Sequence, residues 1–303
     1  MQIPQEPRDP ADFPNWRFET LDFGYDSDTH SVWMCFKADG PHCFTVQTLT
    51  DLANVRASLR AFFASTFIAE TPVHYAALAS NKPGVFNLGG DLSLFADAIR
   101  RGEREVLRAY AHACVDVVHG GVIAYGLPIV TVAVISGQAL GGGLEAALAN
   151  DVLFAEEDAS IGVPEIAFNT FPGMGAVTLL TRRIGAARTE KMIASGKAYS
   201  AQEMLEIGVI DHVVPKGQGV SGALAWMREG GETRRLRRLA VMRARRACFP
   251  VSLEELIRIV DVWTDCSCDV TVRDLRHMDR LAAAQKRIVP ATSSRNESVQ
   301  PAG

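Results

Sequence analysis

Cysteine is scarce in this sequence, with six residues in a chain of 303. Cys266 and Cys268 stand close together, but neither a histidine nor a second cysteine pair lies near them. A zinc site needs three or four ligands, so we expect no metal site there. Sparse cysteine also gives no indication of an oxidising compartment. We expect the remaining four to act as small buried residues: Cys35, Cys43, Cys114 and Cys248.

The sequence also lacks an excess of positive charge, because 31 Lys and Arg stand against 35 Asp and Glu, a net charge of −4. Phosphate binding needs a net positive charge or a concentrated basic face, so we expect no nucleic-acid partner. The N-terminus has no basic start followed by an apolar core, which argues against a secretory signal. The longest weakly polar run, Val122–Leu144, contains Pro128 and five glycines. Such a run is poorly suited to form a membrane-spanning helix. We therefore expect a soluble cytoplasmic protein.

The length of the chain allows about two domains or one large α/β domain. Residues 1–16 are rich in Pro, Asp and Gln and are predicted to form a flexible leader. Strands alternate with helices over residues 17–217, which indicates βαβ units with parallel pairing. Residues 218–288 are predicted to be helical throughout, and the polar residues 289–303 to form a disordered tail.

Hydrophobic periodicity predicts the individual elements. Alternation between Phe18 and Phe36 is typical of an antiparallel hairpin. Further strands are expected at 73–79, 129–135, 152–155 and 210–214, and helices at 48–65 and 103–121. In the second of these helices one face is expected to carry Val106, Tyr110, Ala113 and Val117.

Three consecutive glycines, Gly141–Gly143, follow a predicted strand and precede a predicted helix. Glycines allow a close approach of the backbone to a ligand, and the free N–H groups of a helix start favour negative charge. A tight packing turn is the alternative interpretation. Glu145 follows at once and is flanked by apolar segments, so partial desolvation is expected to raise its pKa and suit it to proton transfer.

Glu165 is a second isolated carboxylate, in the apolar segment 161–166. A glutamate after a proline often does no more than begin a helix. Two such carboxylates beside glycine-rich backbone suggest a pair that divides acid and base roles. The loop 86–91 contains Gly89 and Gly90 and could present another backbone N–H. Phosphate-binding and dinucleotide-binding glycine patterns are absent.

These motifs together resemble the crotonase (enoyl-CoA hydratase/isomerase) superfamily over roughly residues 18–285. The separation of Glu145 and Glu165, 20 residues, equals that of hydratases with two catalytic glutamates. The matching motifs are Phe86-x-x-Gly89-x-Asp91, Gly137-x-Ala139-x-Gly141-Gly142-Gly143-x-Glu145, Pro164-Glu165 and Pro172-Gly173-Met174-Gly175.

The resemblance implies an α/β fold, a crotonase-like spiral of ββα units with a helical C-terminal region. It also implies assembly as a homotrimer or hexamer. Carried over residue by residue, it makes Glu145 and Glu165 the catalytic pair and Gly90 and Gly142 the backbone donors of an oxyanion hole. It implies no cofactor and no metal.

Within the superfamily, the sequence looks most like diffusible signal factor synthases, which act on 3-hydroxyacyl groups carried by acyl carrier protein. The segments 80–92 and 169–175 carry this likeness and depart from the pattern of CoA hydratases. The resemblance implies a fatty-acid signal for quorum sensing as the product. An enoyl-CoA hydratase or isomerase acting on CoA thioesters is one alternative. A crotonase-fold regulatory protein that binds a cognate membrane sensor kinase is another.

The implied reaction has two steps. One glutamate removes an α-proton, with Glu165 preferred as this base, while the other protonates the departing 3-hydroxyl. Water held by the same carboxylates then hydrolyses the cis-2-enoyl thioester to a free fatty acid. Ser136 does not stand in a G-x-S-x-G motif, so no serine nucleophile is expected.

Two further groups of residues are candidates for substrate contact. Apolar and glycine positions are expected to bind the acyl thioester: Gly89, Leu140, Gly141, Met174, Leu180 and Trp263. Each of the apolar ones could equally be core. Clustered arginines on a predicted helix could dock an acidic carrier protein, or could form a solvated helix face: Arg234, Arg235, Arg237 and Arg238.

Overall fold

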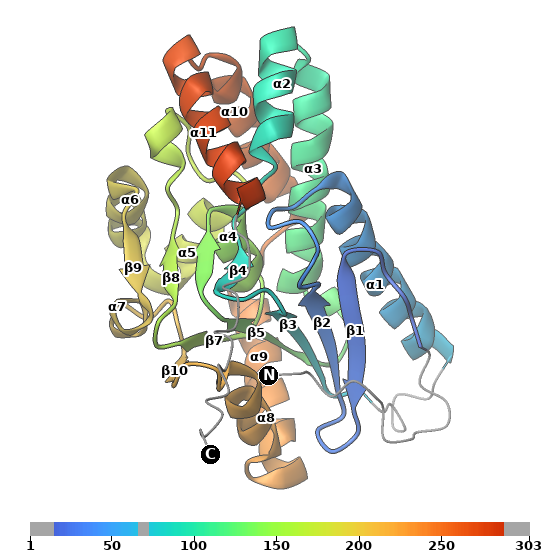
Figure 1. Ribbon diagram of the computed structural model, residues 1–303. Helices are drawn as coiled ribbons and strands as arrows, with labels where there is room; N and C mark the ends of the chain where they lie inside the picture. Colours follow the sequence, from blue (N-terminus) through green and yellow to red (C-terminus); the bar gives the residue numbers. More distant parts are fainter. Residues whose placement is uncertain (1–14, 66–72, 288–303) are drawn as a thin grey trace, which may run out of the picture.

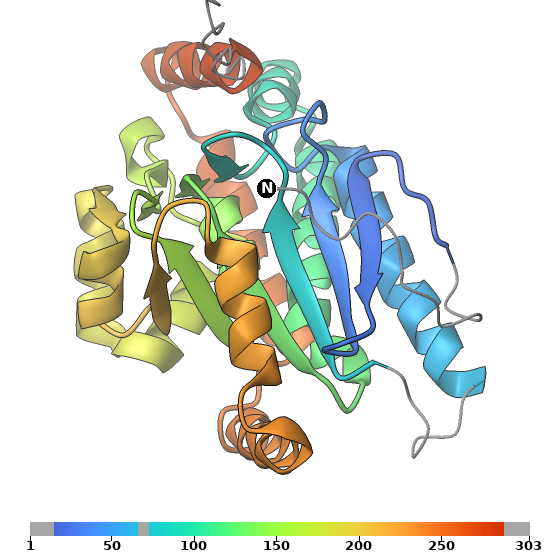
Figure 2. The same ribbon diagram turned by 60° about the horizontal axis from the view of Figure 1, so that its bottom comes forward.

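The computed structural model describes residues 15–65 and 73–287. The tail predicted for residues 289–303, and residues 1–14 of the predicted leader, lie outside this described part. The strands belong to two sheets, and helices cover both faces of the larger one (Figures 1 and 2). The α/β crotonase fold predicted from the sequence is confirmed.

The larger sheet has six strands in the order β1-β2-β3-β5-β7-β10. β1 and β2 form the predicted antiparallel hairpin, in which Leu21 pairs with Phe36. Every other neighbouring pair is parallel, as the alternation of strands and helices predicts. The bounds are β1 Leu21–Asp26, β2 Ser31–Phe36, β3 Tyr75–Ser80, β5 Val130–Ile135, β7 Val152–Glu156 and β10 His212–Val214.

The smaller sheet has the order β4-β6-β8-β9 and was not predicted from the sequence. Each of its strands spans three residues, which is too short for an alternating pattern to stand out. This sheet brings together the strand before the loop 88–91, the strand before Gly141–Gly143 and the strand before Glu165, because β4 pairs with β6 and β6 pairs with β8. The bounds are β4 Val85–Asn87, β6 Gln138–Leu140, β8 Ser160–Gly162 and β9 Ala198–Ser200.

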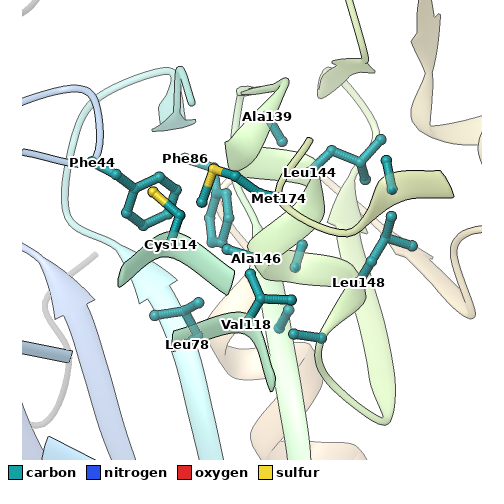
Figure 3. Packing of buried hydrophobic residues seen from close by; sticks show 14 of the residues in the cluster. Phe44, Leu78, Phe86, Cys114, Val118, Ala139, Leu144, Ala146, Leu148 and Met174 are labelled. Atoms are coloured by element: carbon teal, nitrogen blue, oxygen red, sulfur yellow. The ribbon is translucent and has the colours of Figure 1, made fainter. Parts of the chain in front are cut away.

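The helices up to residue 210 pack partly against the larger sheet and partly against the smaller sheet and one another. Their bounds are α1 Val46–Ser65, α2 Leu92–Arg101, α3 Arg104–Val122, α4 Gly142–Leu148, α5 Ala176–Ile184, α6 Ala186–Ser195 and α7 Ala201–Glu206. Two short 3-10 helices, η2 Ala124–Gly126 and η3 Glu165–Phe168, complete the set. Figure 3 shows part of the resulting core, where Phe44 and Phe86 lie beside Cys114 and Met174.

The buried face of α3 differs from the predicted one. Leu107, Tyr110, Cys114 and Val118 point into the core, whereas Val106 is 49% exposed. A helix repeats every 3.6 residues, so an error of one position at its start turns the whole predicted face. The correction matters for function because this face lines the cavity described below.

The C-terminal region is helical, with α8 Gly219–Arg228, α9 Gly231–Cys248, α10 Leu253–Cys268 and α11 Val272–Arg287. α8 covers the second face of the larger sheet, where Ala223 and Met227 join a separate apolar cluster. α10 packs on α3, and α11 packs on α2. α9 has no buried residue, and its last residue, Cys248, is exposed rather than buried as predicted.

Among the described residues, no helix is both long enough and apolar enough to cross a membrane.

Candidate active site

A cavity of about 200 Å³ lies between the smaller sheet, α3, α4 and the C-terminal helices. Its lining is mainly apolar, and the only charged side chains among the described lining residues are Glu145 and Glu165. The remaining lining consists of Leu88, Gly89, Gly90, Leu92, Phe95, Tyr110, Ala111, Cys114, Gln138, Leu140, Gly141, Gly142, Pro164, Phe168, Gly173, Met174, Val260, Trp263, Leu281, Ala284 and Gln285. Two carboxylates in an apolar cavity are strong candidates for chemistry, because burial alters their protonation.

Glu145 stands in the first turn of α4 and is buried. Its Oε1 accepts a hydrogen bond of 2.8 Å from the backbone N–H of Ala176, at the start of α5. Burial raises the pKa of Glu145 to about 7, and the backbone N–H groups of Ala176, Met174 and Gly175 oppose that rise by stabilising the charged form. Glu145 can therefore exchange a proton near neutral pH.

Glu165 is the first residue of η3, and the residue as a whole is partly exposed. Its Oε2, however, is buried and has no hydrogen-bond partner among the described residues. Burial and the negative charge of Glu145 together raise the pKa of Glu165 well above its usual range. The negative charge of Glu145 raises the pKa of Glu165, whereas the backbone N–H groups of residues 174–176 lower that of Glu145, so the surroundings favour a proton on Glu165 over one on Glu145.

The loop 88–91 directs one backbone N–H away from all protein partners. The N–H of Phe44 donates to the carbonyl of Gly89 at 2.7 Å, which fixes the plane of the Gly89–Gly90 peptide. The N–H of Asp91 donates to the hydroxyl of Tyr110. Within the described part of the chain, the N–H of Gly90 alone in this loop lacks an acceptor. Because C=O and N–H of one peptide point in opposite directions, the N–H of Gly90 points away from Phe44.

The N–H of Gly142 lies close to the same loop. Gly142 begins α4, so its N–H belongs to the first turn and has no partner within the helix. A Cβ placed on Gly89, where φ is +89°, would lie 2.9 Å from the nitrogen of Gly142. Only glycine permits this approach. Both segments line the cavity, so the N–H groups of Gly90 and Gly142 are candidate donors to one carbonyl oxygen.

Residues 65–256 match the family model for enoyl-CoA hydratase/isomerase, which is more than half of the chain. The chain belongs to the enoyl-CoA hydratase/isomerase family. It is thus a crotonase-family enzyme that acts on acyl thioesters.

Solved structures support the same fold. An enoyl-CoA hydratase/isomerase from Xanthobacter autotrophicus Py2 superposes with a TM-score of 0.71 at 18% identity, covering 91% of this chain and 100% of that one. An enoyl-CoA hydratase from Bacillus halodurans gives a TM-score of 0.70 at 19% identity, covering 86% and 100%. Pseudomonas aeruginosa DspI gives 0.61 at 21% identity, covering 91% and 100%. At these identities the likeness concerns the fold alone.

The cavity is lined by most of the residues that the sequence predicts to bind substrate. Gly89, Leu140, Gly141, Met174 and Trp263 all line it. Leu180, by contrast, is fully buried in α5 and is not one of the lining residues. The buried positions of α5 belong to the hydrophobic core, so Leu180 packs there instead of contacting substrate.

The four arginines expected to dock a carrier lie on α9, at the end of the molecule opposite α2 and α11 (Figures 1 and 2). α11 contributes to the cavity and α9 does not. Arg234 and Arg238 both pair with Glu229, and Arg235 pairs with Glu232. For Arg237 no partner is found in the described part of the chain. The structure therefore does not bring these arginines to the cavity of the same chain.

Several lining residues were not identified from the sequence. Phe95, Tyr110 and Cys114 come from α2 and α3, and Gln285 comes from α11. The two residues of α3 could have been found from the sequence if the apolar positions of that helix had been assigned to the correct face. Gln285 carried no local signal, because it reaches the cavity from nearly 200 residues beyond the loop that it contacts.

The buried carboxyl of Glu165 predicts a change in stability. A carboxyl whose pKa is raised on folding stabilises the folded state fully only below its unfolded pKa of about 4.5. That contribution is lost as the pH rises towards the higher folded pKa. Glu165→Gln removes the titrating group, so we expect its free energy of unfolding near pH 8 to exceed the wild-type value.

Urea unfolding of both proteins near pH 8 and near pH 4.5 measures this difference. The gain should shrink at the lower pH, where the folded wild-type carboxyl is protonated and about half of the unfolded carboxyls are. An equal gain at both pH values would mean that packing, and not charge, causes it.

Proposed function

We propose that the protein dehydrates a 3-hydroxyacyl thioester to a 2-enoyl thioester and then hydrolyses it to a free 2-unsaturated fatty acid. One observation carries the proposal: Glu145 and Glu165 line the same apolar cavity as the N–H groups of Gly90 and Gly142. An enolate oxygen and the oxygen of a tetrahedral intermediate both need such donors. Both steps also need one carboxylate and one carboxylic acid.

The dehydration begins with ionised Glu165 and protonated Glu145. Glu165 takes the proton from C2, and the electron pair of that C–H bond forms an enolate held by the N–H groups of Gly90 and Gly142. The C2–C3 double bond then forms as the bond from C3 to the hydroxyl breaks, and Glu145 protonates that hydroxyl to give water. The step ends with a proton on Glu165 and a charge on Glu145.

The surroundings favour these final protonation states, because burial and the charge of Glu145 raise the pKa of Glu165 and backbone N–H groups stabilise the charge on Glu145. They are also the states that hydrolysis requires. Glu145 takes a proton from water, whose oxygen attacks the thioester carbonyl, and Glu165 protonates the departing thiolate. The pair returns to its starting states, so the protons balance over one full cycle.

The likeness to diffusible signal factor synthases supports an acyl carrier protein as the carrier and a cis-2-unsaturated acid as the product. It rests on residues 80–92 and 169–175. Within the first segment, Lys82 is buried, and its Nζ donates to the carbonyls of Lys37 and Gly40. Lys82 thus connects this segment to residues 37–40, just before Phe44, which holds the loop 88–91.

Reversible hydration of an enoyl-CoA, without hydrolysis, is the second candidate function. The favoured protonation states support it, because addition of water to C3 begins with ionised Glu145 and protonated Glu165. The two functions differ in whether a free acid appears.

The test supplies the same medium-chain 3-hydroxyacyl group on acyl carrier protein and on CoA, and follows the products by mass spectrometry. We expect free 2-enoic acid and free carrier thiol in equal amounts, with the carrier-protein substrate preferred. Enoyl-CoA formation without free acid would overturn the proposal in favour of the hydratase. Protein with both glutamates replaced by glutamine is the control for uncatalysed hydrolysis.

A further inference from the structure

Gln285, near the end of α11, contacts the loop that carries the Gly90 N–H. The residue is only 9% exposed. Its Nε2 lies 3.2 Å from the carbonyl oxygen of Leu88 and 3.2 Å from that of Gly90. Both neighbours are acceptors, so the amide nitrogen, and not its oxygen, must face the loop. The two hydrogens of one amide group thus serve two carbonyls of the same loop.

The loop needs such support because Gly89 and Gly90 have little conformational preference of their own. The direction of the Gly90 N–H depends on the torsion angles of both glycines. The Gly89–Gly90 peptide is held by Phe44. The carbonyls of the two flanking peptides, those of Leu88 and Gly90, are held by Gln285. Without Gln285 both carbonyls would lose their side-chain donor, and each flanking peptide would be held only at its N–H, that of Gly89 by Asn87 Oδ1 and that of Asp91 by the Tyr110 hydroxyl.

α11 reaches this loop from the far end of the described chain. Leu281 and Ala284 of the same helix also line the cavity, so α11 forms part of its wall. A second contact holds the helix, because Arg100 of α2 pairs with Asp279 at 2.5 Å. Docking of α11 and the orientation of the loop 88–91 are therefore linked through one side chain.

We infer that Gln285 is a positioning residue that orients the Gly90 N–H towards the thioester oxygen. This role rests on the proposed function, in which that N–H stabilises the enolate. The structure gives Gln285 no part in proton transfer. Its loss should therefore weaken stabilisation of the transition state and leave binding of the ground-state substrate nearly unchanged.

The test compares Gln285→Met, which keeps the length of the side chain without a donor, with Gln285→Glu, which places a carboxylate against two carbonyls. We expect kcat to fall about 10- to 100-fold in Gln285→Met, less than the loss of a whole oxyanion donor, and further in Gln285→Glu. KM should stay within about twofold. Asp279→Asn is the matched control, because it removes an exposed ion pair of the same helix, which contributes little to stability, and leaves Gln285 in place.

Two outcomes of the kinetics would overturn the inference: an unchanged kcat in Gln285→Met, or a rise in KM alone that Asp279→Asn reproduces. A second measurement needs no substrate and stays valid if the proposed reaction is wrong. Hydrogen–deuterium exchange of peptides spanning residues 86–92 should be faster in Gln285→Met than in wild type, and near wild type in Asp279→Asn. Equal exchange in all three proteins would show that Gln285 does not hold the loop.

Discussion

Glu145→Gln and Glu165→Gln should each lower kcat for conversion of a 3-hydroxyacyl thioester to free acid by about 10³-fold, within the 10²–10⁴-fold expected of a general acid or base. A glutamine amide neither accepts nor releases a proton at neutral pH. Each glutamate acts once in dehydration and once in hydrolysis, so neither step can proceed normally without it. Steady-state release of free acid and carrier thiol measures the loss.

The hydrolytic step can be tested by itself with the 2-enoyl thioester as substrate. Both variants should lose this activity as well, because Glu145 activates the water and Glu165 protonates the thiolate. Retention of hydrolysis in either variant would contradict a shared pair. Glu156→Gln is a suitable control, since Glu156 is also buried and accepts a hydrogen bond from the N–H of Gly219, but lies outside the cavity. Its kcat should stay within about twofold of wild type.

The larger sheet could be predicted because its strands are long or strongly apolar. β5 is six residues of Val, Thr, Ala and Ile and is buried throughout, so its sequence alone indicates a buried strand. The smaller sheet could not be predicted in this way. β6 pairs with β4 and β8, and this pairing, rather than the local sequence of three residues, makes it a strand.

The two glutamates were identifiable because an isolated acid in an apolar, glycine-rich segment is unusual. Their different surroundings were not, because these come from residues distant in the sequence. Glu145 accepts the N–H of Ala176, 31 residues away, whereas Glu165 has a buried oxygen without a partner in the described part of the chain. These surroundings favour a proton on Glu165 over one on Glu145, although the sequence only suggested that the pair would differ.

Charge patterns were the least informative feature of the sequence. The arginines at 234–238 suggested a docking surface, but Glu229 and Glu232 pair with three of them on the same part of the chain. Such pairs depend on where long side chains reach, which a residue count does not show. The pair of Arg234 and Glu229 is exposed on both sides, and such a pair contributes little to stability, about 0–1 kcal/mol.

Gly141→Ala should lower kcat about 100-fold or more, although it changes no side chain that transfers a proton. A Cβ at residue 141 would lie 2.3 Å from Oε1 of Glu165, so the carboxylate would have to move. The backbone of Gly141 has φ +52° and ψ −125°, which an alanine adopts only with strain. The substitution therefore combines a loss of stability with a displaced catalytic group, and the two effects need to be separated.

Gly185→Ala separates them, because Gly185 also has a glycine backbone conformation, with φ +81° and ψ 156°, but no atom lies within 4 Å of the added Cβ. Both variants should lose about 1–3 kcal/mol of unfolding free energy, and only Gly141→Ala should lose activity. A double-mutant cycle with Glu165→Ala gives the decisive measurement. If alanine at residue 141 acts by displacing the Glu165 carboxylate, it should lower kcat no further once that carboxylate is absent, whereas additive losses would place its effect elsewhere in the cavity.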